Sequence, residues 1–134
     1  MNHILHDTGA IQGLIIGLNV LATTQKDVTP KLDPQIFERP IDETTQTYLL
    51  AAIHGLHGLL DELDWKLWTP PQELDKDRIA DEFADVLAFL GIIEWIIYHR
   101  VGLTPTDLAK AYKAKTKENV SRAITYGKQQ PLEI

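Results

Sequence analysis

The chain has no cysteine among its 134 residues. This absence excludes disulfide bridges, thiolate metal sites and thiol nucleophiles together. The first residues, Met1-Asn-His-Ile-Leu-His-Asp, also lack the basic flank of a signal peptide. Both features fit a reducing compartment, so we expect a cytoplasmic protein.

Basic residues are few, and no apolar run is long. The chain carries 13 lysines and arginines against 19 acidic residues, for a net charge of −6. That balance excludes a large basic footprint for nucleic acid. The longest apolar runs, 14–22 and 89–98, are too short to span a membrane. We therefore expect neither a nucleic-acid nor a membrane partner, although a divalent cation can still bridge an acidic protein to a polyphosphate.

Strand patterns are absent too, because no alternation of period two persists along the chain. Apolar residues recur instead at helical spacing over four segments, approximately 11–25, 44–68, 79–101 and 105–126. The pattern predicts an all-α fold with a four-helix-bundle core. The length predicts a single domain over residues 1–134, with loosely held termini at 1–10 and 128–134.

Local signals predict where these helices begin and end. The proline-containing stretch 26–41 is expected to be an ordered loop, and Pro70-Pro71 to follow the end of the second helix at Trp68. Gly102 stops the third helix and Thr104 caps the fourth. Gly127 is expected to end that fourth helix.

Two acidic stretches stand out. Glu82 and Asp85 are three residues apart, so their carboxylates leave the same side of the third predicted helix, close to its apolar residues. The second helix adds polar groups at three-to-four-residue spacing: His54, His57, Asp61 and Glu62. If the helices pack side by side, these groups converge. The resulting cluster is either an electrostatically unfavourable defect or a binding site for a hard cation. A solvated face is the plain alternative, and imidazole suits softer metals than magnesium.

Three further sets could contact a ligand. Trp65 and Trp68, with Lys66 between them, either close the core or wall off a base. Asn19 is a solvated amide or a base contact. The fourth helix carries a row near one face that suits the oxygens of a polyanion or is simply solvated: Tyr112, Lys115, Asn119 and Arg122.

Together these segments resemble the all-α nucleoside triphosphate pyrophosphohydrolases, the dimeric dUTPase and MazG-like superfamily, over roughly residues 44–127. Asp-Glu-Leu-Asp-Trp-Lys-Leu-Trp68 is similar to the family's Trp-Lys-x-Trp helix end, and Glu82-Phe-Ala-Asp85 to its Glu-x-x-Asp helix. The third match is Lys115…Asn119-Val-Ser-Arg122…Tyr126-Gly127, which looks like the family's Lys…Asn-x-x-Arg…Gly-Tyr ending with the last pair altered.

The resemblance implies metal-dependent hydrolysis of a (deoxy)nucleoside triphosphate, dUTP-like, to the monophosphate and pyrophosphate. It implies Mg²⁺, or Mn²⁺, held by acidic residues of the two helices; here these are Asp61, Glu62, Glu82 and Asp85, with His54 and His57 as possible ligands. Glu62, Glu82 and Asp85 would be catalytic. Lys115, Asn119, Arg122, Tyr112 and Lys66 would hold phosphates, and Trp65, Trp68 and Asn19 the base.

The resemblance also implies a homodimer or a dimer of dimers. The sequence favours an obligate dimer independently. The three tryptophans and the isoleucine pairs 92–93 and 96–97 give more apolar helix surface than one small four-helix bundle can bury.

One departure from the family concerns the second helix. Counted back from Trp65, the two metal-binding glutamates fall at Gly55 and Gly58; a register shifted by one places His54 and His57 there instead. Two carboxylates are therefore missing. Two alternatives stay open: a homologue that has lost hydrolysis and binds nucleotide or serves a regulatory role, and a plain helical interaction module.

Overall fold

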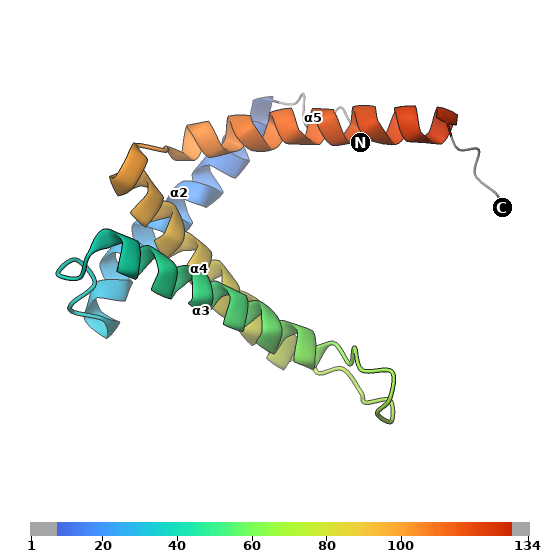
Figure 1. Ribbon diagram of the computed structural model, residues 1–134, viewed down its shortest axis with the longest axis horizontal. Coiled ribbons are helices and arrows are strands. Elements are labelled where there is room, and N and C mark those ends of the chain that lie inside the picture. The colour runs from blue at the N-terminus through green and yellow to red at the C-terminus, as the bar shows by residue number, and fades with distance from the viewer. Residues whose placement is uncertain (1–7, 130–134) are drawn as a thin grey trace. The chain divides into compact units, whose positions relative to one another are not determined.

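The computed structural model describes residues 8–129, which form four α-helices and no strand (Figure 1). The prediction of an all-α fold is confirmed. The helices are α2 (Thr8–Leu32), α3 (Ile41–Glu62), α4 (Lys76–Val101) and α5 (Pro105–Gln129). Within these residues no single helix is long and apolar enough to cross a membrane, although α4 and α5 taken together meet that test by length and composition.

The chain divides into two compact units, each described here by itself. One is Leu18–Leu103, which holds the second half of α2 together with α3 and α4. The other comprises Met1–Gly17 and Thr104–Ile134, of which residues 8–17 and 104–129 are described. That the two units make one domain stays a prediction.

An antiparallel hairpin of α3 and α4 forms the framework of the larger unit (Figure 1). A methyl group in place of a Gly55 hydrogen would lie 3.4 Å from Val86 Cγ2 and 3.5 Å from Phe89 Cδ2. One turn further along α3, Gly58 faces Glu82. The two glycines therefore lie on the side of α3 that contacts α4.

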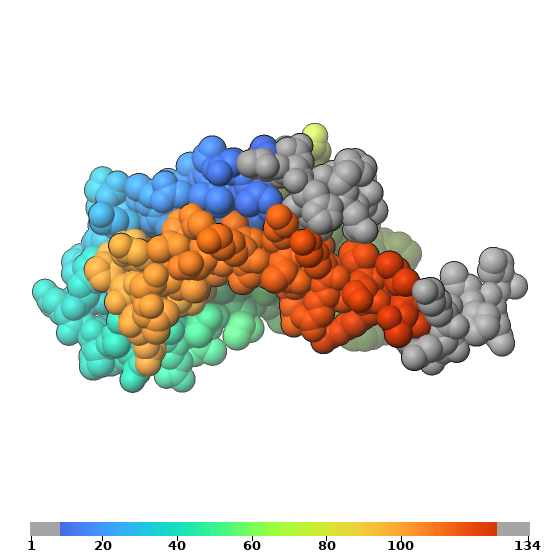
Figure 2. Space-filling view, turned by 90° about the horizontal axis from the view of Figure 1, so that it is seen from above, coloured from blue at the N-terminus to red at the C-terminus, as the bar shows by residue number. Residues whose placement is uncertain are grey.

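The core lies toward the end of the hairpin where α3 begins and α4 ends. Figure 2 shows the start of α3 (teal), the end of α4 (light orange) and the 33–40 segment (cyan) gathered there. The buried residues of this core are Ile36, Tyr48, Ala52, Ile92, Ile93 and Ile96. Burying each large apolar side chain contributes about 1.5–3 kcal/mol to stability, so this core stabilises the hairpin. The opposite end of the hairpin is open to solvent.

Gly91 allows α2 to approach α4 closely. A methyl group at this position would come within 2.6 Å of the Leu21 carbonyl oxygen and 2.9 Å of Gln25 Cγ. The nearest atom belongs to the backbone, so a side chain could be accommodated only by moving α2. Gly91 is therefore a packing residue of the contact between α2 and α4.

A small polar network holds the 33–40 segment against α3. The Asp33 carboxylate accepts hydrogen bonds from both Nη atoms of Arg39 and, at 2.8 Å, from the Tyr48 hydroxyl. The hydrogen bonds from Arg39 lower the pKa of Asp33, while burial of the phenol raises the pKa of Tyr48 to about 12. The buried Thr44 hydroxyl adds a hydrogen bond to the Ile36 carbonyl at 3.1 Å. Each charged group here has a partner, so the network serves to fix the segment.

The local signals for α4 and α5 predicted their adjoining ends correctly. Gly102 is in the left-handed region (φ 73°) and donates its N–H to the Tyr98 carbonyl, which ends α4. Thr104 Oγ1 accepts from Asp107 N at 3.1 Å, and Asp107 Oδ2 accepts from Thr104 N at 3.0 Å. This reciprocal pair caps the start of α5.

Several predicted boundaries were wrong, and both α3 and α4 begin three residues before the predicted 44 and 79. Residues 8–10 and 128–129, which were expected to lie in loosely held termini, belong to α2 and α5, so α5 also continues past Gly127; the rest of both predicted termini lies outside the described residues. α2 runs on through Pro30 to Leu32, whereas the sequence predicted a loop from residue 26. α3 ends at Glu62, six residues before the predicted end at Trp68, because the chain turns at Asp64 with a positive φ of 54°.

Candidate functional site

The predicted acidic site lies in the open half of the hairpin, where Glu82 of α4 faces Gly58 of α3. A methyl group at Gly58 would be 2.6 Å from Glu82 Oε2 and 3.3 Å from its Cδ. The half-buried Glu82 carboxylate therefore lies where a side chain at position 58 would start. Of the two registers the sequence left open, this contact supports the one in which position 58 faces the acidic motif.

Glu62 lies one turn further along α3, and its carboxylate is paired with a residue that the sequence did not single out. Arg78 Nη2 is 3.2 Å from Glu62 Oε1. The Glu62 side chain is only 20% exposed, whereas that of Arg78 is 70% exposed. A guanidinium therefore neutralises one of the two half-buried carboxylates among the predicted ligands.

Asp85 does not lie near the core as expected. Its side chain is exposed, because the third residue after Glu82 is rotated away from α3 and toward solvent. The Glu-x-x-Asp pair thus has one half-buried carboxylate facing α3 and one carboxylate in solvent.

Asp61 is held by two neighbours, one on α3 and one in the turn that follows it. Its Oδ1 accepts a hydrogen bond from Trp65 Nε1 at 3.2 Å, and its Oδ2 lies 3.3 Å from His57 Nδ1. Both Asp61 and His57 are exposed, and His54 is exposed as well. The histidines therefore lie outside the surface shared by Glu62 and Glu82.

The tryptophan pair belongs to the turn that joins α3 and α4. Trp65 and Trp68 pack edge to face with their ring centroids 5.7 Å apart, and Lys66 Nζ lies 5.9 Å from the Trp65 ring. The turn encloses a cavity of about 140 Å³ with Asp61 and Asp64 on its wall. This space is below the size of an ordinary small-molecule site, although the 74% exposed Trp68 leaves an aromatic face open beside it.

The predicted phosphate row lies on α5, in the other unit. Tyr112, Lys115, Asn119 and Arg122 are all exposed. Lys115 Nζ lies 3.5 Å from Glu118 Oε2, and Arg122 bonds to the other oxygen of the same carboxylate. One acid thus partly neutralises both cations of the row. Asn19, on α2 in the larger unit, is also exposed, and its carbonyl accepts from Thr23 Oγ1.

The described part of the chain contains no group of three acidic, histidine or cysteine side chains arranged to hold a metal ion. Glu62 is paired with Arg78, Asp61 with His57, and Asp85 points to solvent. The donor chemistry is nevertheless that of a hard cation, since Glu62 and Glu82 offer carboxylate oxygens from facing helices.

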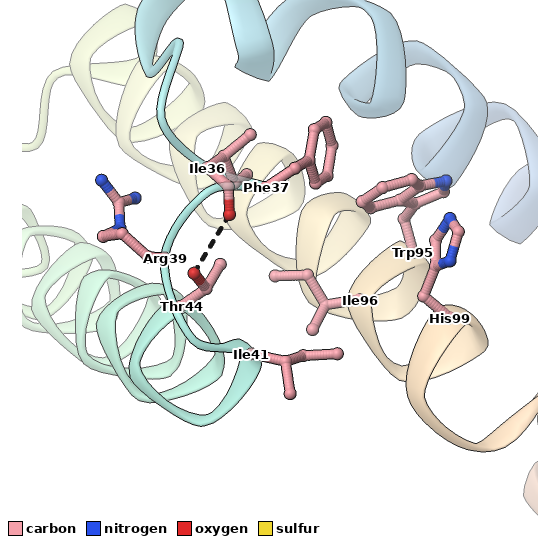
Figure 3. Close-up of a pocket in the computed structure, with 8 residues that line it drawn as sticks. All are labelled: Ile36, Phe37, Arg39, Ile41, Thr44, Trp95, Ile96 and His99. Carbon is pink, nitrogen blue, oxygen red and sulfur yellow. Dashed lines mark hydrogen bonds between the residues drawn. The ribbon is translucent and has the colours of Figure 1, made fainter.

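A second cavity, larger than the one in the turn, lies at the opposite end of the hairpin, among residues that the sequence did not assign to a ligand site (Figure 3). Its volume is about 490 Å³, and its walls are mainly apolar and aromatic: Ile36, Phe37, Ile41, Trp95 and Ile96. Its polar lining residues are Thr44, which donates to the Ile36 carbonyl, Arg39, which is bound to Asp33, and His99, whose ring centroid lies 4.2 Å from that of Trp95. It has no carboxylate on its wall, so it is not the acidic site.

Sequence reasoning also missed Glu94, which is only 7% exposed in α4. Its Oε1 is buried without a hydrogen-bond partner among the described residues. Burial raises the pKa of this carboxyl to about 7. The available signal was a single acid between Ile93 and Trp95, inside an otherwise apolar run.

Comparison of the chain with protein-family models, with curated proteins and with solved structures found no match.

Proposed function

We propose that the chain is a divalent-cation-dependent nucleoside triphosphate pyrophosphohydrolase, acting on a dUTP-like substrate at the acidic surface of the α3–α4 hairpin. The observation that carries the proposal is the position of Glu82 against Gly58, with Glu62 one turn further along α3. The resemblance to the all-α pyrophosphohydrolases pairs these same two helical motifs. Their facing arrangement is what such a site needs.

The charge around this surface favours a cation as the first ligand. Residues 61–85 include nine acidic side chains and three basic ones. A bare triphosphate would be repelled by that field, whereas Mg²⁺ or Mn²⁺ would be attracted and could then bridge to phosphate. Glu62, Glu82 and Asp85 are the residues that would hold the cation.

A bound divalent cation supplies charge neutralisation on the phosphates and a more acidic water. The chain's own residues would contribute binding and orientation. The Asp61 carboxylate holds the Trp65 indole through its N–H, which keeps the tryptophan pair beside the acidic surface. Trp68 then offers an exposed ring for stacking on a base, and Lys66 a cation for a phosphate oxygen. Lys115, Asn119 and Arg122 remain the proposed phosphate contacts of α5.

The direct test is pyrophosphate release from each common (deoxy)nucleoside triphosphate with Mg²⁺, with Mn²⁺ and with EDTA. We expect turnover of at least one substrate that depends on the cation and is lost in Glu82→Gln, whose carboxamide keeps the shape but not the charge. Glu73→Gln, an exposed change in the joining segment, should leave turnover unaltered. Activity that survives EDTA or Glu82→Gln would contradict the proposal.

The second candidate is nucleotide binding without hydrolysis. Gly55 and Gly58 favour it, because the family places metal-binding glutamates at these positions and this chain offers fewer carboxylates for a second cation. Thermal stabilisation by a triphosphate with Mn²⁺, without pyrophosphate release, would select this alternative.

We also propose a homodimer, formed through an apolar stripe on α3. The stripe alternates steps of four and three residues and consists of Leu49, Ile53, Leu56, Leu60 and Leu63. These side chains are 39–61% exposed, and their repeat is that of a helix-packing seam. Phe83, Leu87 and Leu90 continue the same spacing on α4, where they are also exposed. A second copy of the hairpin would cover the stripe with a matching surface.

Leu56→Glu is expected to shift a dimer to monomers, because it places a charge at the centre of the stripe. Its side chain is 52% exposed, so the hairpin loses little packing of its own. Leu32→Glu, at an 82% exposed position at the end of α2, is the matched control and should remain dimeric. Light scattering at micromolar concentration measures both. A monomeric mass for the unchanged protein would refute the dimer.

A further inference from the structure

The cavity at the core end of the hairpin has the size and the walls of a small-molecule site. Its volume of about 490 Å³ lies in the usual range for such sites, which are lined mainly by apolar and aromatic side chains. Ile36 and Ile96 belong to the core and are 1% and 3% exposed, whereas Phe37 and Ile41 are 55% and 44% exposed. The cavity therefore has a rigid base in the core and a mouth that solvent can reach.

An aromatic wall borders this space on the α4 side. Trp95 packs edge to face on Phe37, with ring centroids 4.7 Å apart, and on His99, with ring centroids 4.2 Å apart. Figure 3 shows these three rings in a row beside the cavity. Because each ring is held by its neighbour, the wall keeps its shape without a ligand, and ring faces and edges favour flat apolar partners.

The charged and hydroxyl groups of the lining are already engaged. None of the described residues that line the cavity is acidic. Both Nη atoms of Arg39 bond to the Asp33 carboxylate, and Figure 3 shows the Arg39 side chain extending away from the other lining side chains. The Thr44 hydroxyl donates to the Ile36 carbonyl. The wall thus offers no unneutralised charge for an ionic ligand.

Two polar groups of the aromatic wall are not engaged in this way. Neither the Trp95 indole N–H nor the His99 imidazole forms a hydrogen bond or ion pair with another described residue; their contacts are between rings. His99 is exposed and Trp95 is half-buried. A ligand in the cavity can therefore exchange a hydrogen bond with this wall without displacing a partner.

We propose that this cavity binds a small uncharged molecule with a flat apolar body and a hydroxyl group. The body lies against the Trp95 and Phe37 rings and over Ile96, and the hydroxyl bonds to His99. An ionised ligand of the same shape is disfavoured, because a charge that enters an apolar cavity without a partner loses its hydration. This site shares no residue with the acidic surface, and the inference does not rest on the proposed function.

The three tryptophans provide the readout. Trp65 and Trp68 lie in the turn at the other end of the hairpin, and Trp95 alone lies at the cavity. The test is titration of the ¹⁵N-labelled full chain with 2-naphthol, following the indole N–H signals by NMR; Trp65→Phe and Trp68→Phe assign them. We expect the Trp95 signal to shift saturably and the other two to stay in place. No shift of the Trp95 signal up to the solubility of the probe, or equal shifts of all three, would overturn the inference.

Naphthalene-2-sulfonate tests the class of ligand, because it has the same ring system and a negative charge. We expect it to bind at least about five-fold more weakly than 2-naphthol. Equal or tighter binding of the sulfonate would show that the site selects an anion and would refute the proposed class.

Two variants change the cavity in opposite ways. Phe37→Ala removes part of the aromatic wall and should weaken 2-naphthol binding about three- to ten-fold. Ile41→Trp places a larger side chain at the mouth and should abolish binding. Phe83→Ala is the control for the first, because Phe83 is similarly exposed, at 51%, but lies outside the cavity. Calorimetry measures the affinities and circular dichroism verifies folding. Unchanged affinity in folded Phe37→Ala or Ile41→Trp would contradict the proposal.

A second copy of the chain is the competing occupant of this cavity. If another protomer filled it, the apparent affinity for 2-naphthol would fall when the titration is repeated at about ten-fold higher protein concentration, by mass action. We expect the affinity to stay the same. A decrease would assign the cavity to an interface between copies and overturn the small-molecule proposal.

Discussion

Gly58→Glu is expected to tighten Mn²⁺ binding by about ten-fold or more and to destabilise the cation-free protein. The new side chain starts 2.6 Å from Glu82 Oε2, an atom at the flexible end of its side chain that can move aside. Two carboxylates would then share one space, where they repel each other until a cation neutralises them. Helix propensity works in the opposite direction, since glutamate is favoured over glycine by almost 1 kcal/mol.

Gly55→Glu is the matched control, because it makes the same substitution one turn earlier on α3. The resemblance places the family's metal-binding glutamates at both positions, 55 and 58. Position 55 instead faces Val86 and Phe89, at 3.4 and 3.5 Å. A carboxylate there would be directed at apolar groups, so Gly55→Glu should lose stability without gaining cation affinity.

Thermal unfolding in EDTA and in Mn²⁺, together with calorimetric titration of Mn²⁺, measures both variants. The expected signature is a melting temperature that rises with Mn²⁺ in Gly58→Glu much more than in Gly55→Glu. A folded Gly58→Glu protein that binds no additional Mn²⁺ would show that position 58 is not a ligand position, whatever its contact with Glu82.

The helix ends that the sequence predicted well are those set by neighbours in the chain. Gly102 and Thr104 act through hydrogen bonds to residues three or four positions away, so their effect can be read from a short window. Asp42 and Glu43 lie in the first turn of α3, where acids favour a helix N-terminus, but no side-chain hydrogen bond caps this end, and the helix begins three residues before the predicted 44. The overall helical character follows from periodicity, which is also local.

Other boundaries depend on contacts that a short window does not contain. The buried Thr29 precedes Pro30, and its packing favours an unbroken α2 where proline predicts a loop. At the other end of the hairpin, Asp64 accepts the Gln72 N–H at 3.0 Å across the joining turn. That bond closes the turn after Glu62 and removes the tryptophan pair from the helix that spacing alone predicted.

The acidic site was predictable in part, because one of its contacts follows from helix packing and the other from the choice of an ion-pair partner. That position 58 faces Glu82 follows from helix geometry once the hairpin is assumed. The Arg78–Glu62 pair does not, because an exposed arginine can reach several acids and only the folded chain selects one.

The free energy of unfolding of the unchanged protein is expected to fall as the pH rises above 5. Replacement of Glu94 by glutamine is expected to remove this pH dependence. Burial raises the pKa of the folded carboxyl to about 7, from an ordinary value of 4.5. No charged neighbour contributes to this shift among the described residues. The folded protein thus keeps the proton to higher pH than the unfolded chain does, and ionisation favours unfolding.

The sign of the effect follows from this order of pKa values. Below pH 4.5 the carboxyl is protonated in both states, and its protonation does not change stability. As the pH rises from 4.5 to about 7, the unfolded chain releases the proton first, so stability falls by up to 1.4 kcal/mol per pH unit. The total loss is at most about 3 kcal/mol and is complete once the folded carboxyl has also ionised.

Urea unfolding at pH 5 and pH 8, at one fixed protein concentration, measures the difference. Between pH 5 and pH 8, the free energy of unfolding should fall less in Glu94→Gln than in the unchanged protein. The difference between the two decreases is expected to be about 2–3 kcal/mol at most. Glu43→Gln, at an exposed position in the first turn of α3, should follow the unchanged protein at both values. If Glu94→Gln and the unchanged protein lose equal stability, the Glu94 carboxyl has found a hydrogen-bonding or charged partner, and its isolation in α4 is not a property of the protein in solution.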